Sequence, residues 1–392
     1  MAVHLTTDFC GLTFKNPIII PAGVHGRSGD VMKEVSSSGV AGICTKTIVS
    51  QPSVDVLPCF TAVPGGMINS VFGSDKTAEY WFAEGLKRAK EGSSLVLANL
   101  AGFTPDEAAS LASKAEAAGA DMIMLPTHCP HMGEILMAMY PGMDFPEPKL
   151  TDLGPMQASV KLIKEAVKIP VVVKLSGTFS HITRVWAEGV KASGADGIAS
   201  SDAFGPGLAI DTATGEPCLG GPRGVGGYTG PAILPLNLRI ILEIAMTVDL
   251  PIIGVGGVSS ADDVLQYMMA GASLVGVTTA GHVNGIKRYT KIIEDLSKKL
   301  EEMGASSPED IRGLTLKRLE ARKQNGKQAV TQPIAPTVDG SRCIACKKCE
   351  TVCAYGAAKV VDKVSVIDKA ACIGCGLCVS ACPKGALTQK YY

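Results

Sequence analysis

Short glycine-containing segments recur along the first 280 or so residues, and each separates a helix-like stretch from an apolar run. Glycine in the left-handed conformation commonly ends an α-helix, and a strand can follow within a few residues. The four segments are 38–42, 118–121, 193–196 and 270–273. Further apolar runs, each reached by another helix, lie between them at 18–20, 95–99, 171–174 and 252–254. Eight strand–helix units over this length predict a (β/α)8 TIM barrel, with a doubly wound open sheet as the alternative.

Two of the predicted strands end in a lysine. The segment 170–177 reads PVVVKLSG, which is typical of a parallel strand that is buried on both faces, and it ends in Lys174. The run from Gly42 to Thr45 ends in the same way at Lys46. A cation at the end of a buried strand needs an anionic partner. Because barrel active sites lie at the carboxyl ends of the strands, the lysines predict a bound phosphate-bearing cofactor.

Glycines and hydroxyls follow the last strands. Gly256 and Gly257 come after the seventh strand, and Thr278 and Thr279 come after the eighth. Exposed backbone N–H groups and hydroxyls at these places form the phosphate site that is usual in barrels. The segment 226–230, which includes Thr229 and Gly230, adds further accessible amides. A dinucleotide-binding motif is disfavoured because the third glycine and the acidic residue about twenty positions on are both missing.

Cys129 lies just past the predicted fourth strand, between His128 and His131. A thiol with a pKa of about 8.5 can give or accept a proton near neutral pH, although a free cysteine is more often a small buried apolar residue. The two histidines suggest a metal site, but without a further ligand they are better interpreted as loop histidines. Long loops at 47–74, 126–150 and 201–230 follow strands and indicate function.

The end of the chain carries eight cysteines in a repeated pattern. The spacing C-x2-C-x2-C-x3-C occurs twice, and the offset between the two runs is constant. The cysteines are Cys343, Cys346, Cys349, Cys353, Cys372, Cys375, Cys378 and Cys382. This spacing predicts two [4Fe–4S] clusters, in which the fourth cysteine of each run serves the other cluster. Structural zinc is the alternative, but it uses paired rather than triplet ligands.

These patterns divide the chain into a barrel at 1–312, a polar and proline-containing linker at 313–337 and a small ferredoxin-like domain at 338–392. The 37 basic residues balance the 37 acidic ones, so no net charge attracts nucleic acid or a membrane surface. The amino terminus lacks a basic segment followed by an apolar one, and no apolar run approaches the ~20 residues of a membrane span. We expect a cytoplasmic protein and an oligomer.

Several motifs resemble the class 1 dihydroorotate dehydrogenase barrel. They are Thr-Lys-Thr at 45–47, Asn69 ahead of Lys-Thr-Ala at 76–78, Ala-Asn-Leu-Ala-Gly at 98–102, Cys-Pro-His at 129–131 and Lys-Leu at 174–175. Because a ferredoxin module follows the barrel, the chain is most similar to the FMN and iron–sulfur part of dihydropyrimidine dehydrogenase, including the separate catalytic subunit of the bacterial NAD-dependent enzyme.

The resemblance implies a bound FMN and assigns residues to it. The residues are Ala22, Gly23, Lys46, Asn69, Asn99, Lys174, Thr229, Gly230, Gly256, Gly257, Thr278 and Thr279. It also implies that Cys129 is the general acid that protonates one carbon while the flavin delivers hydride to its neighbour. Asn69, His128, His131 and Asp202 are the residues expected to face a small-molecule substrate.

The substrate pocket departs from the family pattern at two places. Pro126, Thr127 and His128 stand where the pyrimidine enzymes have asparagine ahead of serine–cysteine, and Asp202 and Ala203 replace asparagine–threonine. Proline offers no donor and aspartate only accepts, so the carbonyls of a pyrimidine would lack partners. We therefore expect a substrate other than uracil, thymine or orotate.

The expected function is an FMN-dependent oxidoreductase that reduces or oxidises an activated C=C or CH–CH bond. The clusters would relay single electrons to or from a partner, either a separate NAD(P)H-dependent flavoprotein subunit or a ferredoxin. The alternatives are a true dihydropyrimidine or dihydroorotate dehydrogenase catalytic subunit, an electron-transfer subunit without its own substrate, and a non-redox aldolase or isomerase that uses Lys174 as a Schiff base.

Overall fold

The computed structural model describes residues 3–129, 132–139, 142, 149–201 and 203–391. The chain divides into two compact units, Met1–Leu316 and Lys317–Tyr392. The first unit contains the predicted barrel, and the second contains the cysteine repeats.

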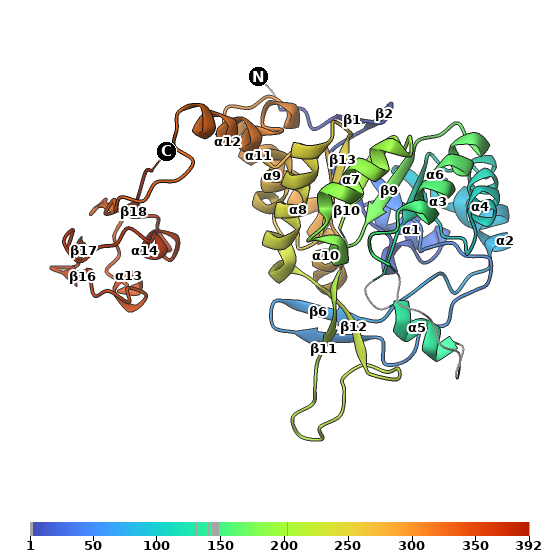
Figure 1. The fold of residues 1–392 in the computed structure, drawn as a ribbon, viewed down its shortest axis with the longest axis horizontal. Helices are drawn as coiled ribbons and strands as arrows, with labels where there is room; N and C mark the ends of the chain where they lie inside the picture. The colour runs from blue at the N-terminus through green and yellow to red at the C-terminus, as the bar shows by residue number, and fades with distance from the viewer. Residues whose placement is uncertain (1–2, 130–131, 140–141, 143–148, 202, 392) are drawn as a thin grey trace. The chain divides into compact units, whose positions relative to one another are not determined.

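Eight parallel strands close into a barrel. Figure 1 shows helices around these strands. The order of the strands around the barrel is β10-β13-β14-β3-β4-β7-β8-β9. The strands are β3 (Ile18–Ile20), β4 (Gly42–Cys44), β7 (Leu95–Asn99), β8 (Met122–Pro126), β9 (Val171–Leu175), β10 (Gly197–Ser200), β13 (Ile252–Val255) and β14 (Leu274–Gly276). The (β/α)8 barrel is confirmed, and the open sheet considered as an alternative is wrong because β9 and β10 pair directly and complete the ring.

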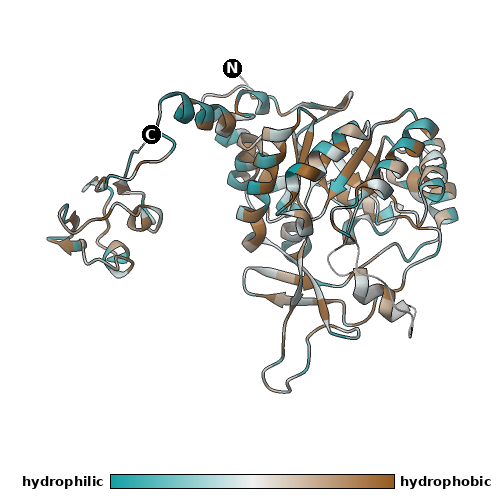
Figure 2. Ribbon diagram, viewed as in Figure 1, coloured by the Kyte–Doolittle hydropathy of each residue, from teal (hydrophilic) through white to brown (hydrophobic). Residues whose placement is uncertain are grey.

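Helices surround the strands, with apolar residues toward the strands and polar residues outward (Figure 2). They are α1 (Gly29–Ser36), α2 (Ala78–Tyr80), α3 (Leu86–Lys90), α4 (Pro105–Ala117), α6 (Gly154–Ala166), α7 (Thr183–Ala192), α8 (Leu234–Thr247), α9 (Ala261–Met269), α10 (Thr279–Asn284) and α11 (Lys287–Glu302). A further helix, α5 (Met132–Met139), follows β8 in the chain. Side-chain caps begin two of the helices. Thr104 accepts the backbone N–H of Glu107 at α4, and Ser260 forms a capping box with Asp263 at α9.

Alternate residues of each strand face opposite sides of the barrel wall. In β9, Val171 and Val173 pack outward against the helices, whereas Val172 packs inside the barrel. In β4, Ile43 faces outward and Cys44 inward. Because side chains alternate with a period of two along a strand, Lys174 lies on the inner face with Val172.

A hairpin plugs the amino-terminal end of the barrel. It is formed by β1 (Thr7–Phe9) and β2 (Leu12–Phe14), which pair antiparallel. Phe9 and Phe14 are almost fully buried and belong to the apolar cluster inside the barrel. Their rings meet edge to face with centroids 6.4 Å apart. The hairpin therefore closes the end opposite the strand carboxyl termini.

An antiparallel sheet that the sequence did not predict forms from two of the long segments after strands. Its order is β11-β12-β6-β5, and the strands are β5 (Phe60–Val63), β6 (Gly66–Asn69), β11 (Phe204–Leu208) and β12 (Val225–Thr229). The pairing of Asn69 with Gly227 joins residues from distant parts of the chain. Figure 1 shows this sheet together with α5 beyond one end of the barrel.

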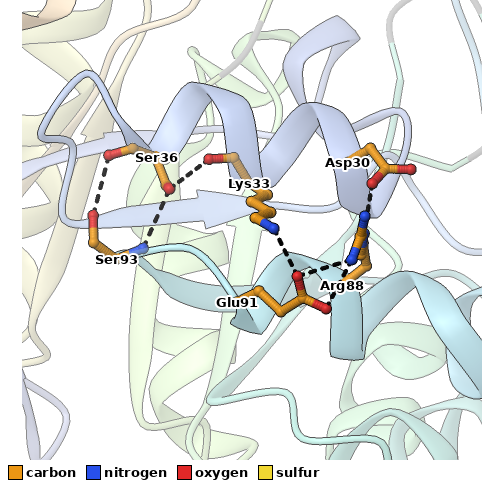
Figure 3. A network of polar contacts seen from close by, with 6 residues as sticks. All are labelled: Asp30, Lys33, Ser36, Arg88, Glu91 and Ser93. Atoms are coloured by element: carbon orange, nitrogen blue, oxygen red, sulfur yellow. Dashed lines mark hydrogen bonds and ion pairs between the residues drawn. The ribbon is translucent and has the colours of Figure 1, made fainter.

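An exposed polar network ties α1 to α3 and to the turn that follows (Figure 3). Arg88 donates to Asp30 at 2.7 Å and to Glu91 at 2.9 Å, and Lys33 donates to Glu91 at 2.7 Å. Hydrogen bonds from Lys33 and Arg88 lower the pKa of Glu91. Because water screens these groups, the network orients the two helices more than it stabilises them.

The second unit is small and internally repeated. Its elements are α12 (Leu314–Gln324, which starts in the first unit), β15 (Thr337–Val338), α13 (Lys348–Thr351), β16 (Ala358–Val361), β17 (Val364–Ile367), α14 (Leu377–Ser380) and β18 (Leu387–Thr388). The helices α13 and α14 occupy equivalent positions in the two halves of the repeat, since each contains the third cysteine of its run. Among the described residues, no helix is both long enough and apolar enough to cross a membrane.

We predict that Phe14→Ala lowers the free energy of unfolding of the barrel by about 3–5 kcal/mol, because it leaves a cavity beneath the strands. Both tryptophans, Trp81 and Trp186, are buried in the barrel unit, so their fluorescence during urea denaturation reports on this unit alone. Phe103→Ala is the matched control, because Phe103 is 75% exposed and should change the unfolding free energy little. Equal effects of the two changes would contradict the plug.

Candidate functional site

A cavity of about 350 Å³ opens between the carboxyl ends of the strands and the antiparallel sheet. This volume lies in the usual range for a small-molecule site, roughly 300–1,000 Å³. All but one of the residues assigned to FMN line it. They are Ala22, Gly23, Lys46, Asn69, Lys174, Thr229, Gly230, Gly256, Gly257, Thr278 and Thr279. Cys129 and His128 line the same cavity.

Asn99 is the assigned residue that does not line the cavity. Its side chain is 1% exposed, and its amide Nδ2 donates to the Thr47 hydroxyl at 2.7 Å. Its amide oxygen is buried without a hydrogen-bond partner in the described part of the chain. Because Thr47 does line the cavity, Asn99 holds a lining side chain in place through this hydrogen bond.

The two lysines line the cavity from separate parts of the barrel wall, because β7 and β8 lie between β4 and β9. Lys174 lies on β9, opposite Pro126 of β8 and Ala199 of β10. Lys46 follows β4 and is only 7% exposed. Burial lowers the pKa of Lys46, and the charges of Asp55 and Cys129 partly offset this effect. A desolvated ammonium group favours an anionic or oxygen-rich ligand, which would restore the interactions lost with water.

Glycines shape the opposite wall, where side chains would fill the space. Gly257 has φ of +81°, and a Cβ there would lie 2.5 Å from the backbone N of Leu234. Gly230 has φ of +103°, and a Cβ would lie 2.5 Å from Cα of Gly66. Only glycine is compatible with both the positive φ and the close approach. The resulting accessible backbone, next to Thr278 and Thr279, fits the phosphate end of a flavin nucleotide.

In the part of the cavity that is predicted to face the substrate, several of the described side chains offer no free hydrogen-bond donor. The Thr127 hydroxyl donates to the Lys174 carbonyl at 2.9 Å. The Asn69 amide donates to the Gly227 carbonyl at 3.3 Å. Pro126 and Ala203 line the cavity without side-chain donors. The predicted substrate residues His131 and Asp202 lie outside the described residues.

His128 lies at the edge of this apolar part. Its ring is tilted against Phe179 with centroids 5.8 Å apart, and Phe179 stacks on Trp186 at 4.0 Å. Phe60, Met67 and other apolar side chains complete the lining. The arrangement suits a flat, largely apolar ligand with its polar end toward the lysines.

A histidine pair that the sequence analysis did not single out lies beside the threonines. His282, on α10, lines the cavity, and its ring contacts Phe60 at 5.2 Å and His25 at 6.1 Å. Burial lowers the pKa of His25 to about 4, with a contribution from His282. The hydroxyl of Tyr289 lies 2.9 Å from Nδ1 of His25. In the sequence, the one feature that could have pointed to His282 is its position one helical turn after Thr279 on the same helix.

Four of the cysteines lie together in the second unit. Burial raises the pKa of Cys378, and the charges of Cys372, Cys375 and Cys353 raise it further. The same four cysteines line one small cavity. Cys353 comes from the first run of the sequence, so the structure places the fourth cysteine of that run with the triplet of the other.

Backbone N–H groups surround the fourth cysteine of each run. Burial raises the pKa of Cys353, but N–H groups of Ala358 and Tyr355 outweigh it and lower the pKa overall. The N–H groups of Ala386 and Lys384 do the same for Cys382. Donors at equivalent offsets favour thiolates at both places, which is the form that binds iron. Among the described residues, no three histidine, cysteine or carboxylate side chains form a single-ion site.

Comparison with known proteins agrees with this architecture. The dihydroorotate dehydrogenase family profile matches residues 4–300, and two 4Fe-4S binding domain profiles match residues 340–356 and 365–388. The catalytic subunit of dihydroorotate dehydrogenase B (NAD(+)) from Pyrococcus furiosus is 33% identical over 316 residues, which is 80% of this chain and all of that protein.

Catalytic subunits with the same name in other organisms show similar coverage. The protein from Methanothermobacter thermautotrophicus is 33% identical over 315 residues, 80% of this chain and 99% of that protein. The protein from Listeria innocua is 29% identical over 311 residues, 79% of this chain and 97% of that protein. These relatives are barrel-sized, so a fifth of this chain lies beyond the matched length.

We predict that Cys353→Ser and Cys378→Ser abolish the same iron–sulfur centre, because both thiolates belong to one ligand set. Each variant, purified without oxygen, should lose about half of the iron and sulfide, and the two should share one residual EPR spectrum when reduced. Cys382→Ser should remove the other centre, so its residual EPR spectrum should differ from that of the first two variants. Cys218→Ser is the control because it lies in the barrel unit, away from both runs. If Cys353→Ser matched Cys382→Ser instead, the crossed assignment would be wrong.

Proposed function

The chain belongs to the dihydroorotate dehydrogenase family, and we propose that it is an FMN- and iron–sulfur-dependent oxidoreductase that acts on a CH–CH or activated C=C bond. The combination of this barrel with a ferredoxin module supports a likeness to the catalytic part of dihydropyrimidine dehydrogenase. The altered substrate pocket distinguishes the chain from that enzyme in the proposal.

The observation that carries the proposal is the shared cavity. Two lysines, a wall of glycine backbone, two threonines and Cys129 face one space at the carboxyl end of the barrel. A phosphate group would be bound at the glycine end, and an oxygen-rich ring would lie against the lysines. The residues present therefore fit FMN.

The chain's own side chains have distinct roles in this arrangement. Lys46 is buried, and its ammonium group is largely removed from water. It would bind the electron-rich edge of the ring. FMN, when bound, exchanges hydride with the substrate and single electrons with iron–sulfur clusters. Cys129 holds a proton at Sγ and gives it to, or takes it from, the substrate carbon next to the one that exchanges hydride. The apolar residues around it exclude water from that proton transfer.

The cysteine module would connect this chemistry to an outside partner. Two [4Fe–4S] clusters are proposed, one for each crossed ligand set. Because the barrel-sized relatives match over only 80% of this chain, the module is an addition to the part that they share with it. A separate NAD(P)H-dependent flavoprotein subunit or a ferredoxin would supply or remove the electrons.

The substrate of the proposed enzyme is not a pyrimidine. Pro126 and Ala203 offer no side-chain donor at the cavity, and the hydroxyl of Thr127 already donates to the Lys174 carbonyl. A pyrimidine ring would leave buried carbonyls unpaired, at about 1–3 kcal/mol each. A cyclic enone or enoyl compound, with one polar group toward the lysines and an apolar body, fits the cavity better.

Dihydroorotate is the second candidate substrate, because the named relatives are dihydroorotate dehydrogenase B catalytic subunits. An electron-transfer subunit without a substrate is the third candidate function. The first experiment is an anaerobic visible spectrum with analysis of extracted cofactor, followed by a panel of cyclic enone, enoyl and pyrimidine compounds. Protein without flavin and iron would contradict the whole proposal.

Cys129→Ser should lower the rate of substrate turnover by about 100- to 10,000-fold, because a hydroxyl is a much weaker acid than a thiol. FMN content and the rate of electron transfer between clusters and flavin should stay as in the wild type. Steady-state assays measure substrate turnover, and stopped-flow absorbance measures electron transfer between clusters and flavin. Cys59→Ser, at a thiol that does not line the cavity, is the control. Unchanged turnover in Cys129→Ser would exclude its proposed role.

Uracil, thymine and dihydroorotate should show no turnover above background with the wild-type protein, a chemical one-electron mediator and reductant or oxidant. The expected reason is the lack of side-chain donors at Pro126 and Ala203. Product formation is checked by chromatography, with the best compound of the enone and enoyl panel as positive control. Robust turnover of a pyrimidine would establish the alternative substrate class.

A further inference from the structure

The overall charge balance of the chain conceals a strong difference between its two units. The segment Lys317–Tyr392 contains 13 lysine and arginine residues but only 5 aspartate and glutamate residues. The remaining 24 basic and 32 acidic residues belong to Met1–Leu316. The second unit is therefore basic, and the distribution of its charges around the two ligand sets can be compared position by position.

The internal repeat makes this comparison direct, because the constant offset that relates Cys343 to Cys372 gives each position a counterpart. Four basic residues flank the cysteines Cys343, Cys346, Cys349 and Cys382. They are Arg342, Lys347, Lys348 and Lys384, which we call the basic surface. Their counterparts around the other ligand set are Ala371, Gly376, Leu377 and Tyr355. One ligand set thus has a cation at every one of these positions and the other has none.

The four side chains of the basic surface are exposed and available. Lys347 and Lys348 lie between two cysteines of the first triplet, and Lys384 lies two residues after Cys382. The guanidinium of Arg342 packs beside Gly385, which brings it next to Lys384. Within the described ranges, none of the four forms an ion pair with a carboxylate.

The acidic residues near the basic surface are engaged in bonds inside the unit. Asp339 accepts from the backbone N and the hydroxyl of Ser341, and these hydrogen bonds lower its pKa. Glu350 accepts the backbone N–H of Val360 at 3.1 Å. The basic surface therefore has four cations and two neighbouring carboxylates, so its net charge is positive.

Two of the counterpart side chains at the opposite ligand set are exposed and uncharged. Tyr355 is 56% exposed and Leu377 is 52% exposed. At these positions the opposite set offers no charge to a partner. The two ends of the second unit thus differ in the type of contact that they can make, although their folds repeat.

We propose that the basic surface is the docking site for a soluble one-electron carrier protein that has an acidic surface around its redox centre. The inference rests on the proposed function, in that it requires clusters at the cysteine sets. Cations placed at the ligand loops of a redox centre would bring an acidic carrier to within transfer range of that centre. Complementary charge raises the rate of encounter and orients the partner, while it adds less to the final affinity.

The electron balance of the proposed encounter is simple. In one encounter the reduced carrier loses one electron and the cluster held by the first triplet and Cys382 gains it. No bond is formed or broken, and no proton moves. Two encounters supply the two electrons that a CH–CH reaction needs, and the reverse sequence removes them.

The test uses the full-length protein, reconstituted and handled without oxygen, with a plant-type [2Fe–2S] ferredoxin as the acidic carrier. Stopped-flow absorbance follows oxidation of the reduced ferredoxin at increasing potassium chloride concentrations. For the wild type, we expect the second-order rate constant to fall as salt rises, because salt screens the attraction. The variant Lys347→Glu with Lys348→Glu should be slower by about 10-fold or more at low salt and should approach the wild type at high salt.

The matched control is Lys369→Glu with Lys390→Glu. It makes the same change in net charge at exposed lysines outside the basic surface, one near the other triplet and one near the chain end. Its rate should stay within about twofold of the wild type. Equal slowing in both variants, or a wild-type rate that does not depend on salt, would overturn the docking site.

Spin counting by EPR after dithionite reduction separates this inference from its premise. Full cluster signals in the wild type and both variants, together with equal slowing, would overturn only the docking site. A wild type without cluster signals would overturn the proposed function and the docking site together.

Discussion

One buried and one half-buried lysine at the mouth of a closed barrel are the constraint on which the site depends. Lys174 continues the inward-facing row of β9, and Lys46 is almost fully buried after β4. Desolvation disfavours a charged amine unless a ligand or counter-charge is close. The glycines on the opposite wall keep space open for such a ligand. The charge of the lysines and the shape of the cavity therefore both favour an anionic or oxygen-rich ligand.

The rest of the first unit holds this arrangement in place from both ends. The β1–β2 hairpin fills the amino-terminal end of the barrel with Phe9 and Phe14, which pack against the side chains inside it. At the carboxyl end of the strands, the antiparallel sheet brings Met67, Asn69 and Thr229 to the cavity. One end of the barrel is therefore a core and the other is a binding site, although the same eight strands build both.

The second unit shows how a duplicated fold can acquire two different ends. The backbone donors around Cys353 recur at the matching positions around Cys382, which keeps both ligand sets equivalent in their immediate surroundings. The side chains that flank the cysteines are not equivalent. Three lysines and an arginine flank one ligand set, and uncharged residues occupy the matching positions at the other. The two cysteine sets thus share their backbone donors, whereas the charge of the side chains that flank them differs.

The sequence by itself determined the barrel and the cysteine pattern, because both depend on short-range regularities. The glycine segments and apolar runs specify strand and helix periods, and the cysteine spacing specifies ligand loops. The antiparallel sheet and the place of His282 were decided only by tertiary structure. Asn69 pairs with Gly227, and His282 contacts Phe60, across separations that leave no local pattern. Alternation along β7 places Asn99, assigned to the cofactor from its motif, on the inner face with Leu97, but Asn99 is bonded to the Thr47 hydroxyl and does not line the cavity. Only closure of the barrel determines which side chains reach the cavity.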